Sequence, residues 1–134
     1  MLQNPQVRID VDDGRRWLMR NPGHKLGVIL MNTSYRWRSN MSNLPSLEFL
    51  QLVRRHLNPA GVHLYNTTGS KEAMLTGVSA FPFGMRLANF MAVSDTPLQL
   101  DARGGLDVPG ALQNRWPARV CLVTGSNIAA GCSK

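Results

Sequence analysis

The sequence predicts an α/β protein in which helices flank a mostly parallel sheet, and three segments carry this prediction. Leu26–Met31 is an apolar run of six residues, which is typical of a strand buried on both faces. Ser46–Leu57 repeats its apolar residues at helical spacing, and Val62–Asn66 then has the composition of a second strand. Because a helix joins two buried strands, we expect a crossover connection and parallel pairing.

A strand, a turn and a short helix precede these segments. Val7–Val11 alternates apolar and polar residues, which indicates a short strand. In the turn that follows, Asp13 can cap a helix, and Gly14 places no Cβ in a tight bend. Arg15–Arg20 is then predicted as a short helix that ends at Asn21–Gly23.

The later elements are predicted from turn residues and apolar spacing. Asn32–Pro45 is polar and rich in turn residues, which indicates a loop before the helix that Ser46 caps. Asn58–Gly61 is expected to stop that helix before the next strand begins. We expect a further helix over Lys71–Val78 and a further strand over Leu87–Val93.

Length and composition indicate one globular domain. The chain has 134 residues, of which 43% are apolar and 17% charged, values that are ordinary for a folded domain with a core. We expect an α/β domain over residues 1–101. Residues 102–134 form a poorly patterned tail, with one short strand at Ala118–Thr124.

The sequence also excludes several classes of site. No run approaches the roughly 18–20 apolar residues that span a bilayer, so we expect no membrane span. Met1–Asp10 lacks the pattern of a signal peptide, and we therefore expect a cytoplasmic protein. Cys121 and Cys132 have no histidine or cysteine at metal-ligand spacing, which favours free thiols and no metal.

Positive charge is concentrated in one part of the chain. The net charge is +7, and residues 15–55 contain many arginines but only one acid, Glu48. Such a surface attracts anionic partners, including nucleic acid, although a solvated basic face gives the same pattern. Because no nucleic-acid-binding motif accompanies the charge, we do not expect nucleic acid as a partner, and a basic nucleic-acid-binding protein is the third hypothesis.

Small polar residues follow each of the three predicted strands. These stretches are Asp12–Gly14, Asn32–Tyr35 and Asn66–Gly69. Ligands of open parallel sheets bind at the carboxyl ends of the strands, and these groups suit a nucleoside or an amine. Each stretch alone is better explained as an ordinary turn or cap, whereas three at successive strand ends make a ligand site as well supported as that explanation.

Three segments resemble the spermidine synthase family of polyamine aminopropyltransferases. Val11–Leu18 resembles the family's DGR-x-(F/W)-L stretch, Lys25–Asn32 its following YD-V-I-hydrophobic-D strand, and Leu47–Val62 its next helix and turn. The order and spacing agree from Val7 to about Pro97, some two thirds of the chain. The resemblance implies a Rossmann-like, class I methyltransferase-type fold, of which this chain has the C-terminal half and lacks the first strands.

The resemblance also implies roles for particular residues. Asp13 would accept hydrogen bonds from an adenine amino group, Gly14 would let the ring approach, and Asp12 and Thr33 would complete the cofactor site. Asn32 would lie beside the reacting carbon, at the position of the family's catalytic aspartate. The implied cofactors are S-adenosylmethionine, decarboxylated S-adenosylmethionine or methylthioadenosine.

The chain departs from the family at three points. Asn32 can hydrogen-bond an amine but cannot take its proton. Tyr35 replaces the acid that holds the distal ammonium of the polyamine, and Asn66 stands where the family often has glutamine; these two are the expected substrate-binding residues. The family's glycine-rich first turn has no counterpart before Val7.

Two hypotheses therefore come before nucleic-acid binding. The first is a truncated or divergent transferase domain that binds an adenosine-type small molecule. The alternative is a catalytically inactive interaction module that forms a homo-oligomer. A half-sheet without its first strands would expose an edge, and a second copy in a homodimer would cover it.

Overall fold

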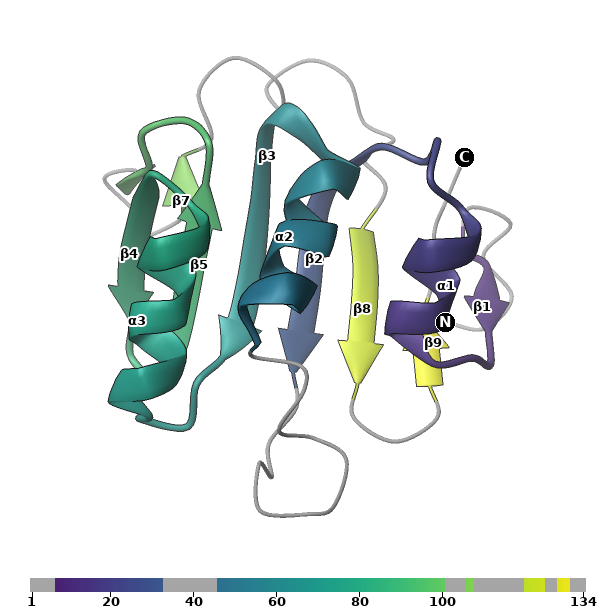
Figure 1. Cartoon of the computed structure of the whole chain (residues 1–134), viewed down its shortest axis with the longest axis horizontal. Helices are drawn as coiled ribbons and strands as arrows, with labels where there is room; N and C mark the ends of the chain where they lie inside the picture. The colour runs from purple at the N-terminus through teal and green to yellow at the C-terminus, as the bar shows by residue number, and fades with distance from the viewer. Residues whose placement is uncertain (1–6, 33–45, 101–105, 108–119, 125–127, 131–134) are drawn as a thin grey trace.

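The computed structural model describes residues 7–32, 46–100, 106–107, 120–124 and 128–130 (Figure 1). In these residues the helices are α1 (Gly14–Arg20), α2 (Leu47–His56) and α3 (Lys71–Ala80). The first strands in chain order are β1 (Ile9–Asp10), β2 (Leu26–Asn32), β3 (Leu57–Asn66), β4 (Phe83–Leu87) and β5 (Phe90–Ser94). The later strands are β6 (Gln99–Leu100), β7 (Leu106–Asp107), β8 (Val120–Thr124) and β9 (Ile128–Ala130).

The main sheet has the strand order β1-β9-β8-β2-β3-β5-β4, and β6 pairs with β7 in a separate two-stranded sheet. Strands β8, β2 and β3 are mutually parallel, whereas the other neighbours in the main sheet pair antiparallel. The sheet is therefore mixed, and the expectation of a mostly parallel sheet was wrong. A short connection suffices for the antiparallel pairs β4–β5 and β8–β9, whereas β1 and β9 pair although they come from opposite ends of the chain.

The central unit β2–α2–β3 confirms the predicted crossover. Ser46 caps α2, since its hydroxyl accepts a hydrogen bond from the backbone amide of Phe49 at 3.3 Å. Phe49, Leu50 and Val53 on α2 are buried, and β2 and β3 pair in parallel. All three helices lie in front of the sheet in Figure 1 and so cover one of its faces.

Strand β3 begins earlier than the sequence indicated. Asn58–Gly61 was expected as a helix stop, but β3 starts at Leu57, directly after α2. The pairing moves from Leu26–Leu57 to Val28–Val62, so residues 58–61 bulge opposite a single residue of β2. A Cβ at Gly61 would lie 3.0 Å from the backbone nitrogen and oxygen of Asn58, which explains the glycine in this bulge.

The predicted strand over Leu87–Val93 is instead part of a hairpin. Strands β4 and β5 are joined by a turn at Ala88 and Asn89, and Ala88 has a positive φ of 53°. The carbonyl of Asn89 accepts hydrogen bonds from both the backbone amide and the hydroxyl of Thr67, each at 2.8 Å. Contacts with the segment after β3 thus hold a turn where the sequence alone indicated a continuous strand.

The C-terminal third of the chain supplies strands β7, β8 and β9. The short strand predicted at Ala118–Thr124 is confirmed as β8, and it pairs in parallel with β2 from Val28–Val120 to Asn32–Thr124. Strand β2 is therefore a central strand, with β3 on one side and β8 of the same chain on the other. The backbone groups of a central strand need hydrogen-bond partners, and β8 provides them.

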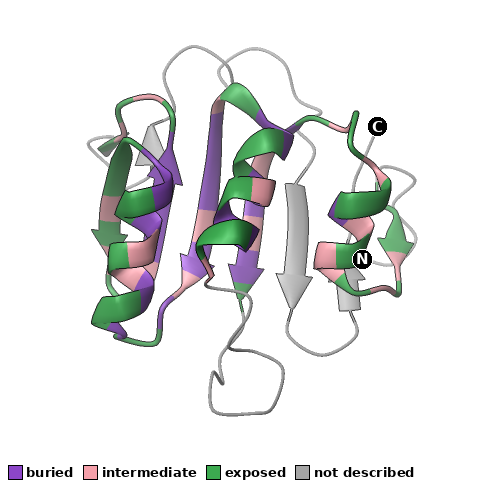
Figure 2. Ribbon diagram, viewed as in Figure 1, coloured by how far each residue is buried: buried purple, intermediate pink, exposed green. Residues whose placement is uncertain are grey.

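The main core lies between the helices and the sheet, where buried residues gather in Figure 2. Tyr65 of β3 is fully buried, and its hydroxyl donates to the carbonyl of Ala73 on α3 at 2.7 Å. Gly77 allows this approach, since a Cβ there would lie only 2.2 Å from the Tyr65 hydroxyl. The contact fixes the distance between α3 and the sheet.

Candidate functional site

The carboxyl ends of β8, β2 and β3 share one edge of the sheet, at the bottom of Figure 1. All three helices begin at the same edge, and Asp13, Ser46 and Ser70 cap them. Helix N-termini present backbone N–H groups and a positive dipole end. The edge therefore combines strand ends with hydrogen-bond donors, which is the usual setting of a ligand site in an open α/β sheet.

Asn32 and Asn66 meet at this edge. They are the last residues of β2 and β3, and Nδ2 of Asn66 donates to Oδ1 of Asn32 at 3.1 Å. Oδ1 of Asn66 accepts from the backbone amide of Thr68 at 2.8 Å and from its hydroxyl at 3.3 Å. Thr68 and Gly69 both have positive φ, at 47° and 75°. The Thr68–Gly69 turn therefore holds the side-chain amide of Asn66 in place, and this amide orients the side chain of Asn32.

The side chain of Asn32 is exposed, and its Nδ2 group has no hydrogen bond within the described part of the chain. The Nδ2 group is thus a donor at the strand end that none of the described residues engages. The sequence prediction that Asn32 and Asn66 lie at successive strand ends is confirmed. Thr68, which lies in the same polar stretch, was not singled out, although the Thr-Gly pair after a strand is a recognisable turn signal.

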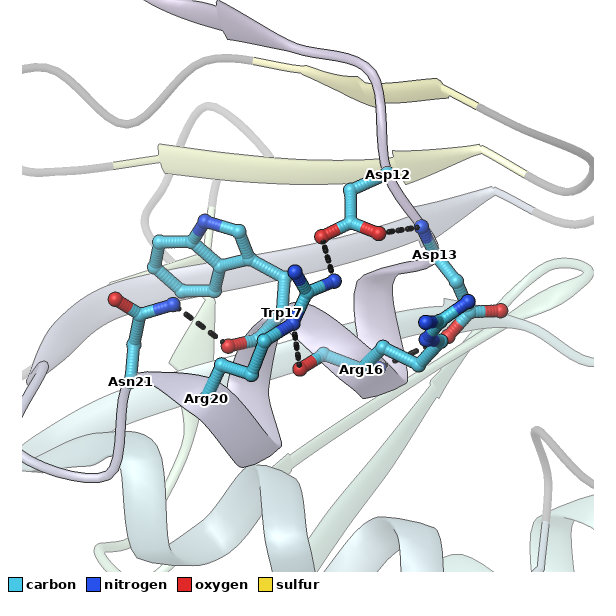
Figure 3. A network of polar contacts seen from close by, with 6 residues as sticks. All are labelled: Asp12, Asp13, Arg16, Trp17, Arg20 and Asn21. Atoms are coloured by element: carbon cyan, nitrogen blue, oxygen red, sulfur yellow. Dashed lines mark hydrogen bonds and ion pairs between the residues drawn. The ribbon is translucent and has the colours of Figure 1, made fainter.

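The Asp12–Asp13 turn is held by local contacts, which Figure 3 shows. Oδ1 of Asp13 accepts from the backbone amide of Arg16 at 2.9 Å, which confirms the predicted cap of α1. Asp12 uses both carboxylate oxygens: Oδ1 accepts from the backbone amide of Asp13 at 2.8 Å, and Oδ2 pairs with Arg20 at 2.5 Å. These carboxylates stabilise the turn, and Asp13 keeps Oδ2 free of hydrogen bonds to other described residues.

The two groups of predicted site residues do not meet. Strands β9 and β8 lie between β1 and β2, so three strand spacings, about 14 Å, separate the Asp12–Gly14 turn from Asn32 across the sheet. A ligand that contacts both would have to be elongated. Thr33 and Tyr35, the other predicted cofactor- and substrate-binding residues, lie outside the described residues.

Two carboxylates near this edge lie in the first turns of α2 and α3 and accept hydrogen bonds there. Glu48, in the first turn of α2, has its pKa lowered by a hydrogen bond from its own backbone amide and by one from the Ser46 hydroxyl. Glu72, in the first turn of α3, accepts from the Ser70 hydroxyl at 2.7 Å. A carboxylate with a lowered pKa is a weaker base, so Glu48 is poorly suited to proton transfer near neutral pH.

Two histidines belong to the core and not to this site. His56 lies with Nδ1 2.9 Å from the carbonyl oxygen of Leu52 and Nε2 3.2 Å from that of Asn21, linking α2 to the end of α1. His63 is fully buried on β3, and burial lowers its pKa to about 4 despite a hydrogen bond to the Ile29 carbonyl. A largely neutral, enclosed imidazole cannot exchange protons with a ligand at the strand ends.

Several basic side chains of residues 15–55 are engaged in contacts. Besides the pair formed by Arg20, Arg54 lies 2.7 Å from Asp95 and donates to the carbonyl of Ala80 at 2.8 Å. The ammonium group of Lys25 donates to the carbonyl of Arg55 at 2.6 Å. Part of the basic surplus therefore stabilises the fold.

Within the described residues, no three histidine, cysteine, aspartate or glutamate side chains gather as metal ligands would. No helix in the same residues has the length and apolar character needed to cross a membrane. The described groups at this edge are thus amides, hydroxyls and helix N-termini, together with carboxylates that hydrogen-bond to the helix starts.

A scan against models of known protein families and a search of curated proteins found no match to this chain. The fold and the site are therefore interpreted from their own geometry.

Proposed function

We propose that the edge formed by the carboxyl ends of β8, β2 and β3 binds an adenosine-type small molecule. In this proposal the chain is a divergent spermidine synthase-like domain of the Rossmann-like methyltransferase type. The observation that carries the proposal is the Asn32–Asn66 pair, in which a turn-held amide orients a second amide at the ends of adjacent parallel strands.

The separation between the Asp12–Gly14 turn and Asn32 across the sheet favours an elongated ligand. Asp13 has one carboxylate oxygen left to accept from an adenine amino group, while Asn32 offers an N–H donor about three strand spacings away. A nucleoside with an extended side chain has polar groups at both ends and suits this spacing. S-adenosylmethionine has this form and ends in a carboxylate that can accept from Asn32. Decarboxylated S-adenosylmethionine ends in an ammonium group, which would donate to Oδ1 of Asn32 instead, and methylthioadenosine ends in an apolar methyl group and would occupy only the Asp13 end.

The residues support binding better than they support amine transfer. The first two of these compounds carry a carbon already activated for attack, so the chain would need only to orient the amine and accept its proton. Asn32 can orient an amine through Oδ1, but an amide is not a base near neutral pH. This observation favours the second candidate, a catalytically inactive module that acts through association with another copy.

Isothermal calorimetry with each of the three nucleosides tests the proposal. We expect measurable heat in the micromolar to millimolar range, and a loss of affinity for S-adenosylmethionine of about tenfold in Asn32→Ala, which removes one donor. Asn58→Ala is the matched control, because Asn58 is an exposed asparagine near the opposite end of the same strand as Asn66. Absence of heat for all three ligands at millimolar concentration would exclude the adenosine site.

A second variant separates binding from catalysis. Asn32→Asp restores the carboxylate that an aminopropyltransferase uses, and it should create or raise amine transfer from decarboxylated S-adenosylmethionine if the rest of the site is intact. Retained nucleoside binding without any transfer would assign the edge to binding alone.

A further inference from the structure

Strand β1 ends the main sheet, and within the described residues no strand pairs with its outer side. The apolar side chains of this segment are unusually exposed: Val7 at 45%, Ile9 at 47% and Val11 at 79%. An edge strand with exposed β-branched residues and free backbone N–H and C=O groups is a template for pairing with another chain.

The segment Val7-Arg8-Ile9-Asp10-Val11 is complementary to itself in antiparallel orientation. When Ile9 lies opposite Ile9 of a second copy, Val7 lies opposite Val11 on the same face. Arg8 then lies opposite Asp10 on the other face, and the two-fold axis repeats both contacts. We propose that a second copy of this chain pairs antiparallel with β1 about Ile9 and continues the sheet across the dimer.

The charges select this register over its neighbours. If the second copy is shifted by two residues, Arg8 lies opposite Arg8 or Asp10 lies opposite Asp10. Parallel in-register pairing produces both of these like-charge contacts. A shift by one residue moves the apolar side chains to the opposite face of the sheet. Of the registers that keep the apolar side chains on one face, the one centred on Ile9 joins opposite charges without also placing like charges opposite each other; pairing about Asp10 would join Arg8 with Asp12 but place Asp10 opposite Asp10.

The charged groups are available for this contact. Nε of Arg8 lies 3.0 Å from Oδ1 of Asp10 in the same copy, and the two side chains are 72% and 29% exposed. Such a solvent-exposed ion pair contributes little by itself, so its rearrangement toward a second copy meets little resistance. In the dimer the four groups form an alternating cluster across the two-fold axis.

The opposite edge of the sheet lacks this complementarity. Strand β4 has the sequence Phe-Gly-Met-Arg-Leu, and antiparallel pairing about Met85 would place Arg86 opposite Gly84. The inference therefore locates the contact at β1. It does not depend on the proposed nucleoside site, which uses Asp13 and Asn32 and none of residues 7–11.

Sedimentation velocity of the full chain from about 1 µM to about 1 mM covers the range expected for a small interface. We expect a monomer–dimer equilibrium for the wild type. The single reversals Arg8→Asp and Asp10→Arg each place like charges opposite one another twice, and should raise the dimer dissociation constant about tenfold or more. The double variant carrying both changes restores the opposite pairs and should dimerise like the wild type.

Arg86→Asp is the control, since it reverses a charge on the other edge strand and should leave the equilibrium unchanged. Far-UV circular dichroism verifies that each variant folds. Amide hydrogen exchange of the wild type gives a readout without substitution: residues 7–11 should become protected as concentration rises.

Three results would overturn the inference. These are a wild type that stays monomeric throughout, single reversals that dimerise as well as the wild type, and a double variant that fails to regain association. Exchange at residues 7–11 that does not depend on concentration would overturn it as well, even if a variant failed to fold.

Discussion

His63 makes the free energy of unfolding depend on pH, and a single substitution can separate its contribution from those of the other titrating groups. Its ring is fully buried and stacks on Tyr65, with ring centroids 5.1 Å apart and an interplanar angle of 14°. The carbonyl oxygen of Ile29 lies 3.0 Å from Nδ1 and can only accept, so Nδ1 carries the hydrogen. Nε2 is then a buried acceptor without a hydrogen-bond partner among the described residues, and burial lowers the pKa of His63 from 6.5 to about 4.

The direction of the effect follows from proton linkage. Well above pH 6.5 the imidazole is neutral in both the folded and the unfolded state and does not change the free energy of unfolding. Between pH 6.5 and about 4 the unfolded chain binds a proton that the folded protein excludes, so stability falls as the pH falls. At 1.36 kcal/mol per pKa unit, the loss over this window is about 3 kcal/mol, and it stops below pH 4.

The informative variant is His63→Phe, which keeps an aromatic ring against Tyr65 and cannot titrate. Urea unfolding at half-unit steps from pH 7.5 to 3.5 measures the free energy of unfolding of both proteins. Carboxylates titrate equally in the two chains, so the difference between them isolates His63. We expect that difference to move by about 3 kcal/mol in favour of the variant between pH 7 and pH 4.

Tyr65→Phe is the control for disturbing the same core. It removes the hydrogen bond to Ala73, but the pKa of Tyr65 is raised to about 12, so this group does not titrate in the window. Its curve should lie about 1 kcal/mol below that of the wild type and parallel to it. If the His63→Phe curve is also parallel to the wild type, burial does not hold the imidazole neutral and the reasoning fails.

The other predictions concern the backbone. Asp13→Ala should destabilise the protein by about 1 kcal/mol, since it removes the cap of α1, whereas Asp13→Asn should retain most stability; thermal unfolding distinguishes them. Gly77→Ala should cost about 1–3 kcal/mol, because its methyl group meets the buried Tyr65 hydroxyl at 2.2 Å. Gly84→Ala should cost less, because its nearest neighbour, at 2.6 Å, is the end of the flexible Met91 side chain, and the next, Cγ1 of Val78 at 2.9 Å, belongs to an exposed residue that can move. Ala88→Gly should raise stability by up to about 1 kcal/mol, because it relieves a positive φ, and a lower urea midpoint would contradict this.

Local patterns predicted the helices and the central strands well. Ser46 and Asp13 cap helices as their sequence positions indicate, and the apolar run at Leu26–Met31 forms β2. These features depend on contacts within a few residues, which a single sequence displays directly. The bulge at Asn58–Gly61 was missed, because its proline and glycine are stop signals in most settings and only pairing with β2 makes them part of a strand.

The candidate site was predictable in part. That Asn32 and Asn66 follow successive strands could be inferred from the sequence, and their 3.1 Å contact follows from parallel pairing in register. That the Asp12–Gly14 turn lies three strands away could not be inferred, because it depends on the insertion of β8 and β9 between β1 and β2. The family resemblance remains a proposal that the binding experiment tests.

The sequence by itself determined which segments are helix or central strand and where the caps lie, since spacing of apolar residues and capping are short-range effects. Only the tertiary structure decided the order of the strands and the edge that they expose. Strand β8 lies far along the chain from β2, yet it covers the edge of β2 that would otherwise be unpaired. Long-range backbone pairing satisfies hydrogen bonds that no local pattern specifies, and among the described strands it leaves β1 and β4 at the two ends of the main sheet.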